Sequence, residues 1–241
     1  MAVQFHGSII DFTTFDLIMD TILENGCKPF IELGFMPYDL VDPSYKKPEH
    51  RKQGEAWSAY QDYEREYHSC PPKDHSKWQA LVEKVLVHLK QRYGKEEVVS
   101  WYFELWNEPD IFYWKGSNED FLKLYDYTVE AVESCFPEVR IGGPATCGPK
   151  EGHNSAILLD QFLAHCAVGV NFATGEKGTR LDYITFHAKG GGFPFQLEAS
   201  QESPCVRTML DQLNLGLDIM ETHGYGDKEV VISEADPDGW A

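Results

Sequence analysis

The chain has 241 residues, of which 42% are hydrophobic and 25% are charged. This composition is typical of a soluble globular protein, and the length suffices for one sizeable core, so we expect a single domain over residues 1–241. The formal net charge of -18 argues against nucleic acid and anionic membranes as partners, because both bind basic surfaces.

Further classes of protein are disfavoured by the spacing of the cysteines and histidines and by the first residues. The six cysteines form no CxxC pair, which is typical of free thiols in a reducing compartment. The nine histidines form no HExxH motif, so we expect no structural metal. The chain opens without a signal-peptide pattern, and no apolar stretch is long enough to span a membrane. We therefore expect a cytoplasmic protein, or one that has lost its leader.

The first elements follow the order strand, helix, strand. Residues 3–10 predict a short strand. Apolar residues at helical spacing then predict a helix that Thr13 or Thr14 caps and that Asn25 and Gly26 end. The run PFIELGF predicts a strand that is covered on both faces. Together these segments have the size of one βαβ unit.

Residues 37–72 form a long segment that is polar, aromatic and rich in proline. Such a loop at the end of a strand is usually functional or disordered. Its aromatic side chains either line a sugar subsite or pack a lid onto the rim, and both readings stay open. These aromatic residues are Tyr38, Tyr45, Trp57, Tyr60, Tyr63 and Tyr67.

Helices and strands alternate through the rest of the chain. The apolar spacing predicts helices over residues 76–93, 118–135, 155–168 and 204–222, and strands over residues 98–106, 139–142, 182–187 and 229–234. With the first two strands, we count about six. Short apolar strands that alternate with helices favour an α/β protein with a parallel sheet and right-handed crossovers. The length is close to that of an α/β barrel.

Polar side chains end three of the predicted strands. The stretch WYFELWNEPD begins as a strand and stops at Pro109, so Glu108 lies at a carboxyl end. His187 lies on the polar face of the strand YITFHAK, near its end. Glu234 ends the last strand. In parallel α/β proteins the catalytic residues usually lie at the carboxyl ends of the strands, at one mouth of the sheet. The alternative for WYFELWNEPD is a core strand that runs into an ordinary turn.

Two carboxylates at one mouth suit the cleavage of a glycosidic bond. One carboxyl must stay protonated to give a proton to the leaving oxygen, and the other must be ionised to attack the anomeric carbon. A separation of about 5–5.5 Å indicates direct attack and a covalent glycosyl-enzyme, whereas roughly 6.5–9.5 Å leaves room for a water and inverts the centre. The sequence leaves this distance open.

Four motifs in chain order resemble glycoside hydrolase family 39: FHG, KPFIELGFMP, FELWNEPD and a late ISEAD. LWNEP with a second Glu after a later strand is similar to a wider group of retaining glycoside hydrolases, and the four motifs together are specific to the family. The resemblance implies a (β/α)8-type TIM barrel. Here it is incomplete, with about six strands and without those that correspond to the first and eighth. The accessory β-sandwich common in the family has no counterpart in the sequence.

The resemblance assigns the central roles residue by residue. Glu108 corresponds to the general acid/base, and Glu234 corresponds to the nucleophile. Asn107 corresponds to the residue that holds the sugar hydroxyl next to the anomeric carbon. His6 and His187 correspond to histidines of the glycone pocket, although the residues alone also allow His6 to be an ordinary core histidine.

Further matches concern substrate binding. Glu32 corresponds to an acidic residue on the third strand; alternatively, it is a structural partner for a base. Lys189, Gly190, Asp236 and Trp240 are similar to the pattern with which α-L-iduronidases hold a uronate. The segment EADPDGW is one residue shorter than that pattern. A solvated lysine and an aspartate in a turn are the alternatives at these positions.

The resemblance implies a retaining β-xylosidase that needs no cofactor and releases xylose from xylo-oligosaccharides, as in xylan degradation. The alternatives are an α-L-iduronidase-like hydrolase and an inactive, truncated carbohydrate-binding remnant. A barrel without two strands has open edges with unpaired backbone groups. We therefore expect copies of the chain to associate as a homo-oligomer that covers these edges.

Overall fold

A five-stranded parallel sheet organises the residues that the computed structural model describes, which are 4–6, 9–42, 67–190 and 206–236. The spatial order β3-β4-β5-β6-β7 follows the order along the chain, as expected for successive right-handed crossovers. The strands are β3 (Phe30–Leu33), β4 (Tyr102–Leu105), β5 (Arg140–Thr146), β6 (Tyr183–Lys189) and β7 (Val230–Asp236).

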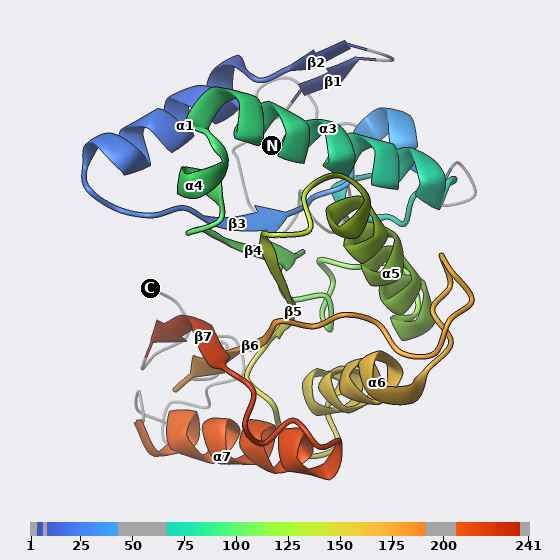
Figure 1. Cartoon of the computed structure of the whole chain (residues 1–241). Coiled ribbons are helices and arrows are strands. Elements are labelled where there is room, and N and C mark those ends of the chain that lie inside the picture. The colour runs from blue at the N-terminus through green and yellow to red at the C-terminus, as the bar shows by residue number, and fades with distance from the viewer. Residues whose placement is uncertain (1–3, 7–8, 43–66, 191–205, 237–241) are drawn as a thin grey trace, which may run out of the picture.

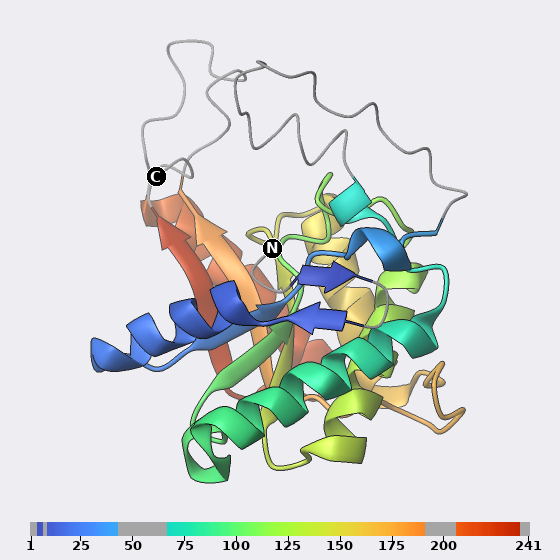
Figure 2. The same ribbon diagram turned by 90° about the horizontal axis from the view of Figure 1, so that it is seen from above.

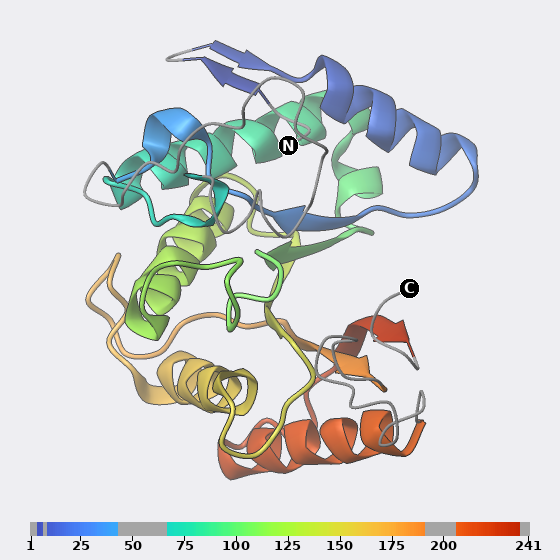
Figure 3. The same ribbon diagram turned by 180° about the vertical axis from the view of Figure 1, so that it is seen from behind.

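The sheet curls into a half-barrel, and helices cover its convex side (Figures 1 and 3). This covering agrees with the apolar character of the strands, since a parallel sheet is stable when both faces are protected. No helix in the described part of the chain has the length and apolar character needed to cross a membrane. The helices are α1 (Thr13–Glu24), α3 (His75–Tyr93), α4 (Lys95–Val98), α5 (Asn118–Cys135), α6 (Asn154–Val168) and α7 (Val206–Thr222).

The α/β prediction and the partial barrel are confirmed, but the first predicted strand is wrong. Residues 3–10 do not form one strand of the parallel sheet. Instead, β1 (Gln4–His6) and β2 (Ile9–Asp11) form a separate antiparallel pair, with Phe5 opposite Ile10. Figure 1 shows this pair apart from the curled sheet, and Figure 2 shows its two strands as dark-blue arrows that point in opposite directions. The sequence has Gly7-Ser8 at the centre of the segment, and such a pair is typical of turns.

The start of α1 also differs from the prediction, whereas its end agrees. Neither predicted threonine caps the helix, because Phe12 is the N-cap residue and provides no side-chain cap. The carboxylate of Asp11 instead accepts a hydrogen bond from the Thr13 amide at 2.9 Å. Asn25 ends the helix, and Gly26 follows with a φ of 74°, a conformation that glycine adopts readily.

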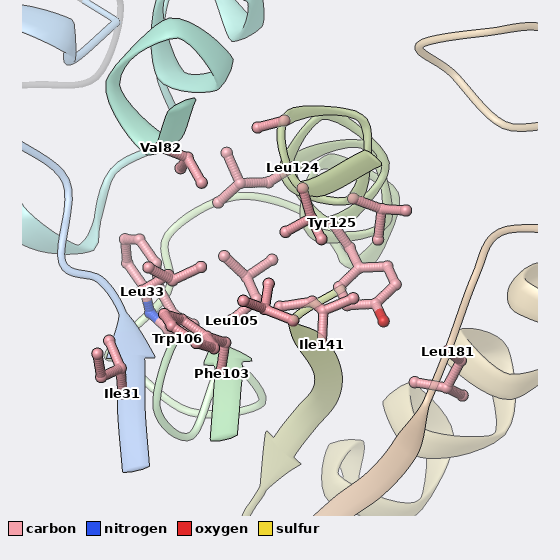
Figure 4. Packing of buried hydrophobic residues seen from close by; sticks show 14 of the residues in the cluster. Ile31, Leu33, Val82, Phe103, Leu105, Trp106, Leu124, Tyr125, Ile141 and Leu181 are labelled. Carbon is pink, nitrogen blue, oxygen red and sulfur yellow. The ribbon is translucent and has the colours of Figure 1, made fainter. Parts of the chain in front are cut away.

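The convex face of the sheet carries the hydrophobic core. Ile31 of β3 and both Phe103 and Leu105 of β4 are buried there, because alternate residues of a strand point to the same side. Figure 4 shows these side chains gathered with Val82 of α3 and Leu124 of α5. Since one parity of each strand faces the helices, the other parity faces the hollow of the half-barrel.

The concave face carries aromatic and acidic side chains in layers. Phe30 and Tyr102 are opposite in register, and their rings stack with centroids 5.4 Å apart and an interplanar angle of 7°. The next residues of the same parity are Glu32 and Glu104, which are also opposite in register. The register therefore brings two carboxyl groups side by side, one layer nearer to the carboxyl ends of the strands.

Gly142 is required by the ring of Tyr183, because an added Cβ would lie 2.4 Å from a ring carbon. The ring is buried, and its hydroxyl donates a hydrogen bond to the carbonyl oxygen of Phe103. We expect Gly142→Ala to lower the free energy of unfolding by about 1–3 kcal/mol, measured by urea denaturation. Gly143→Ala is the control, since its nearest neighbour atom lies at 3.4 Å. Equal losses in the two variants would contradict this account.

Candidate active site

An irregular backbone directs Glu108 into the hollow of the half-barrel. After β4, Trp106 and Glu108 have positive φ values of 67° and 44°. The Glu108 amide donates to the carbonyl oxygen of Ala145 at 2.9 Å, and Ala145 itself has a φ of 52°. Positive φ is uncommon outside glycine and persists where surrounding contacts impose it, often at functional sites. The end of β4 is therefore shaped for the position of one side chain.

An extra residue in β7 turns the side chain of Glu234 into the hollow of the half-barrel. Phe186 of β6 is opposite Ile232, but Ala188, two residues later, is opposite Ala235, three residues later. Such a bulge reverses the side to which the following side chains point. Ile232 packs against the core, whereas Glu234 contacts groups in the hollow. Without the bulge, the two would share the core-facing parity.

The predicted acid/base and nucleophile meet at one imidazole. Nδ1 of His187 lies 2.9 Å from Oε1 of Glu108 and 3.7 Å from Oε2 of Glu234. One ligand-type atom from each of the three residues lies within 4.8 Å of the other two. The imidazole is fully buried, the Glu108 side chain is 14% exposed, and the Glu234 side chain is 39% exposed. The nucleophile candidate is thus the one that solvent reaches most easily.

Lys189 supplies the positive charge beside Glu234. Its ammonium lies 2.7 Å from Oε2 of Glu234 and 2.6 Å from Oδ2 of Asp236. Burial lowers the pKa of Lys189, but the hydrogen bonds to these two carboxylates outweigh it, so the pKa is raised above its usual value. Lys189 therefore stays positively charged between these two carboxylates.

The charge state of Glu108 differs from the requirement for a resting acid. Burial raises the pKa of Glu108, but the hydrogen bond and charge of His187, followed by a hydrogen bond from the Cys147 thiol, outweigh it and lower the pKa below its usual value. Before substrate binds, Glu108 is thus an ionised partner of His187. It must take up a proton before it can act as an acid.

The other predicted residues are partly brought to the site. Glu32 lies on the open side of β3, where its side chain is exposed; desolvation by neighbouring atoms, followed by the charge of Glu234, raises its pKa to about 7. Oδ1 of Asn107 is buried without a hydrogen-bond partner among the described residues. His6 has a described backbone in β1, but its side chain, like all of Trp240, lies outside the described residues.

Three residues beside the carboxylates were missed by the sequence reasoning. Asp110 is half-buried, and desolvation raises its pKa to about 6 despite a hydrogen bond from the Cys147 amide to its Oδ1 at 2.8 Å. Glu104 is buried on the concave face below the mouth. A charged residue inside an apolar strand was a signal for Glu104. No local signal exists for Cys147, because only the pairing of β4 with β5 brings it near residue 110.

One cation could contact Glu108, His187 and Glu234 at the same time, because their ligand-type atoms are close together. Imidazole nitrogen and carboxylate oxygens are ligands that Zn²⁺ accepts. The ammonium of Lys189, however, already lies 2.7 Å from Glu234 and would repel a cation. A cation site at Glu108, His187 and Glu234 is therefore disfavoured.

Comparison with known proteins identifies the family. The model for the glycosyl hydrolases family 39 matches residues 4–241. The chain belongs to this family. The resemblance seen in the four sequence motifs is thereby confirmed. Membership of family 39 agrees with glycoside hydrolysis as the chemistry.

Two curated relatives in family 39 have different names. A "Beta-xylosidase" of Caldicellulosiruptor saccharolyticus is 33% identical over 204 residues, which are 84% of this chain and 36% of the relative. The human "Alpha-L-iduronidase" is 28% identical over 239 residues, which are 98% of this chain and 31% of the relative. The chain thus spans about a third of the length of the curated relatives it matches.

Solved structures give the same pair of names. A bacterial orthologue of human α-L-iduronidase superposes with a TM-score of 0.74 at 26% identity, over 100% of this chain and 35% of the other. A monomeric β-xylosidase from Caulobacter crescentus superposes with a TM-score of 0.72 at 28% identity, over 98% of this chain and 43% of the other. The family 39 fold is therefore shown, and the substrate is not decided by similarity.

Lys189→Met tests the charge beside Glu234. Without the ammonium, Glu234 loses the charged hydrogen bond that holds its carboxylate. We expect kcat/KM for glycoside hydrolysis to fall by roughly 10- to 100-fold, as for the loss of one hydrogen bond to a charged group. Lys84→Met, at an exposed position on α3, is the matched control. An unchanged kcat/KM in Lys189→Met would show that this ion pair does not position Glu234.

Proposed function

We propose that the chain carries the catalytic centre of a retaining β-xylosidase. One observation supports this most strongly: a carboxylate oxygen of Glu108 lies within 4.8 Å of one of Glu234. A short separation of this kind suits direct attack, for which about 5–5.5 Å is typical, rather than attack by an intervening water, for which roughly 6.5–9.5 Å is needed. The β-xylosidases among the relatives supply the substrate class.

In the first step, Glu234 attacks the anomeric carbon while Glu108 gives a proton to the leaving oxygen. Lys189 holds the attacking carboxylate in place through their contact at 2.7 Å. The amide oxygen of Asn107, which has no hydrogen-bond partner in the described part of the chain, is available to accept a hydrogen bond from the sugar hydroxyl next to the reacting carbon. The products of this step are a free alcohol and a xylosyl ester of Glu234.

In the second step, Glu108 removes a proton from water, which attacks the ester and frees the sugar. The lowered pKa of Glu108 suits this base. For the first step Glu108 must take up a proton as the substrate binds, and the nearby charge of Glu234 assists this, because two close carboxylates resist double ionisation once solvent is excluded. Esterification removes that charge, so Glu108 releases its proton more easily when it must act as a base.

The charges around the site favour a neutral sugar. The ammonium of Lys189 already contacts two carboxylates of the chain, Glu234 and Asp236. Glu108 and Glu32 add acidic groups nearby. A uronate would bring another negative charge into these surroundings, which like-charge repulsion opposes. A xyloside brings none.

An α-L-iduronidase-like specificity is the second candidate. The specific observation in its favour is that the Lys189 side chain remains 21% exposed, so a substrate carboxylate has access to it. The iduronidases among the relatives have the same family fold. The two candidates share the roles of Glu108 and Glu234 and differ only in the glycone.

The catalytic roles are tested with Glu234→Gln and Glu108→Gln on aryl β-xylosides. We expect Glu234→Gln to lose nearly all turnover with every leaving group. Glu108→Gln should lose about 10²–10⁴-fold with a poorly acidic phenol, and far less with dinitrophenol, which leaves without a proton. Glu229→Gln is the control, since Glu229 lies just before β7 and pairs with Arg140. Unaltered rates in either site variant would overturn the assignment, and sugar binding without turnover by the native chain would favour the inactive remnant.

The glycone is tested by comparing kcat/KM for an aryl β-xyloside with that for an aryl α-L-iduronide. We expect the xyloside to be preferred, because it adds no negative charge beside Glu234 and Asp236. A preference for the iduronide, abolished by Lys189→Met, would instead establish the second candidate.

Self-association through the sheet edges stays a prediction. β3 and β7 are the end strands of the five-stranded order, and edge strands can pair with another chain. Light scattering at micromolar concentration tests it, and a sharp monomer peak would count against it.

A further inference from the structure

Glu104 is a buried acid that the mechanism above does not use. Its side chain has 0% exposure, and neither carboxyl oxygen has a hydrogen-bond partner among the described residues. It lies on β4, four residues before Glu108, and opposite Glu32 of β3 in register. The hydroxyl of Ser233, the residue before Glu234, is likewise buried and unpartnered in this part of the chain.

The basic side chains at the mouth contact other carboxylates. Lys189 contacts Glu234 and Asp236, and the imidazole of His187 contacts Glu108 and Glu234. The titratable groups that interact with Glu104 come from three other strands. They are Glu32 on β3, Tyr183 on β6 and Glu234 on β7.

We propose that Glu104 is held as a neutral carboxylic acid beside the nucleophile, and that its neutrality leaves the contact between Lys189 and Glu234 undisturbed. The proposal rests on the proposed role of Glu234. Its physical basis is that an ionised carboxylate, fully buried and without a cation or donor, is far less stable than the protonated acid. Among Glu32, Glu104 and Glu234, the proton therefore stays on Glu104, the acid that solvent does not reach.

The direction of the pKa shift supports the geometry. Burial, followed by the charges of Glu32 and Glu234, raises the pKa of Glu104 to about 8. The hydroxyls of Thr185 and Ser233 oppose this shift, although neither makes a well-formed hydrogen bond to the carboxyl. Glu104 is thus neutral at pH 7, while Lys189 contacts Glu234.

Ionisation of Glu104 would disturb the nucleophile. A second buried carboxylate would repel Glu234, with which Glu104 already interacts. The attacking oxygen would then leave the position fixed by the contact at 2.7 Å. We therefore expect glycosylation to slow as the pH rises through the pKa of Glu104.

The kinetic test measures the glycosylation rate constant from pH 5 to 10 with dinitrophenyl β-xyloside, which does not require a proton from Glu108. In the native chain we expect the rate constant to fall about tenfold per unit above pH 8, as for a single titrating group. Glu104→Gln, which stays neutral, should retain the native rate constant at pH 6 and show no alkaline fall. Glu104→Met, also uncharged and of similar length, takes its place if the glutamine variant does not fold.

Glu32→Gln is the matched control, because it removes the acid opposite Glu104. We expect the alkaline fall to persist in this variant with its midpoint at lower pH, since the charge of Glu32 no longer raises the pKa of Glu104. An alkaline fall that persists unchanged in folded Glu104→Gln would overturn the proposal. So would a loss of activity in that variant at every pH, because ionised Glu104 would then be required.

Infrared spectroscopy provides a readout that is independent of turnover. We expect protonated-carboxyl bands in the native chain at pH 7, one of which remains in Glu32→Gln and is lost when Glu104 is also replaced by Gln. Absence of this band from Glu32→Gln would overturn the proposal even if xylosides are hydrolysed. Its presence in a chain that hydrolyses no glycoside would leave Glu104 neutral and would refute the proposed function instead.

Discussion

The contact of one buried imidazole with two carboxylates is the constraint on which the site depends. His187 lies 2.9 Å from Glu108 and 3.7 Å from Glu234, and those carboxylates are themselves within 4.8 Å. At this distance two unit charges repel by on the order of 3 kcal/mol before further screening by solvent. The imidazole and the Lys189 ammonium offset this repulsion, so that two acids can share one sugar ring with different proton affinities.

Local departures from regular strand geometry produce this arrangement of the carboxylates. A parallel strand gives one parity to the helices and the other to the hollow, as the stacked pair Phe30 and Tyr102 shows. The positive φ of Glu108 and the extra residue of β7 before Ala235 break that regularity where each strand ends. Strand bodies therefore hold the core, and strand ends aim the reactive groups.

Periodicity in the sequence was sufficient for the long helices and for the existence of the five parallel strands, because a long amphipathic pattern has few other stable placements. It was insufficient for residues 95–101, where the short helix α4 precedes a strand that begins only at Tyr102, and for residues 3–10, where two three-residue strands pair with each other. The carboxylate pair was predictable, since both acids lie at the carboxyl ends of strands. The bulge that turns Glu234 inward and the hydrogen bond that lowers the pKa of Glu108 were not, because both depend on contacts between distant segments.

The stereochemistry of the first product tests the central claim most directly. Proton NMR of the sugar released from an aryl β-xyloside distinguishes the β-anomer from the α-anomer before mutarotation mixes them. Two displacements at the carbon, the first by Glu234, predict the β-anomer as the first product. Initial release of the α-anomer would mean that water attacks directly, and it would contradict a site built on two carboxylates that lie within 4.8 Å of each other.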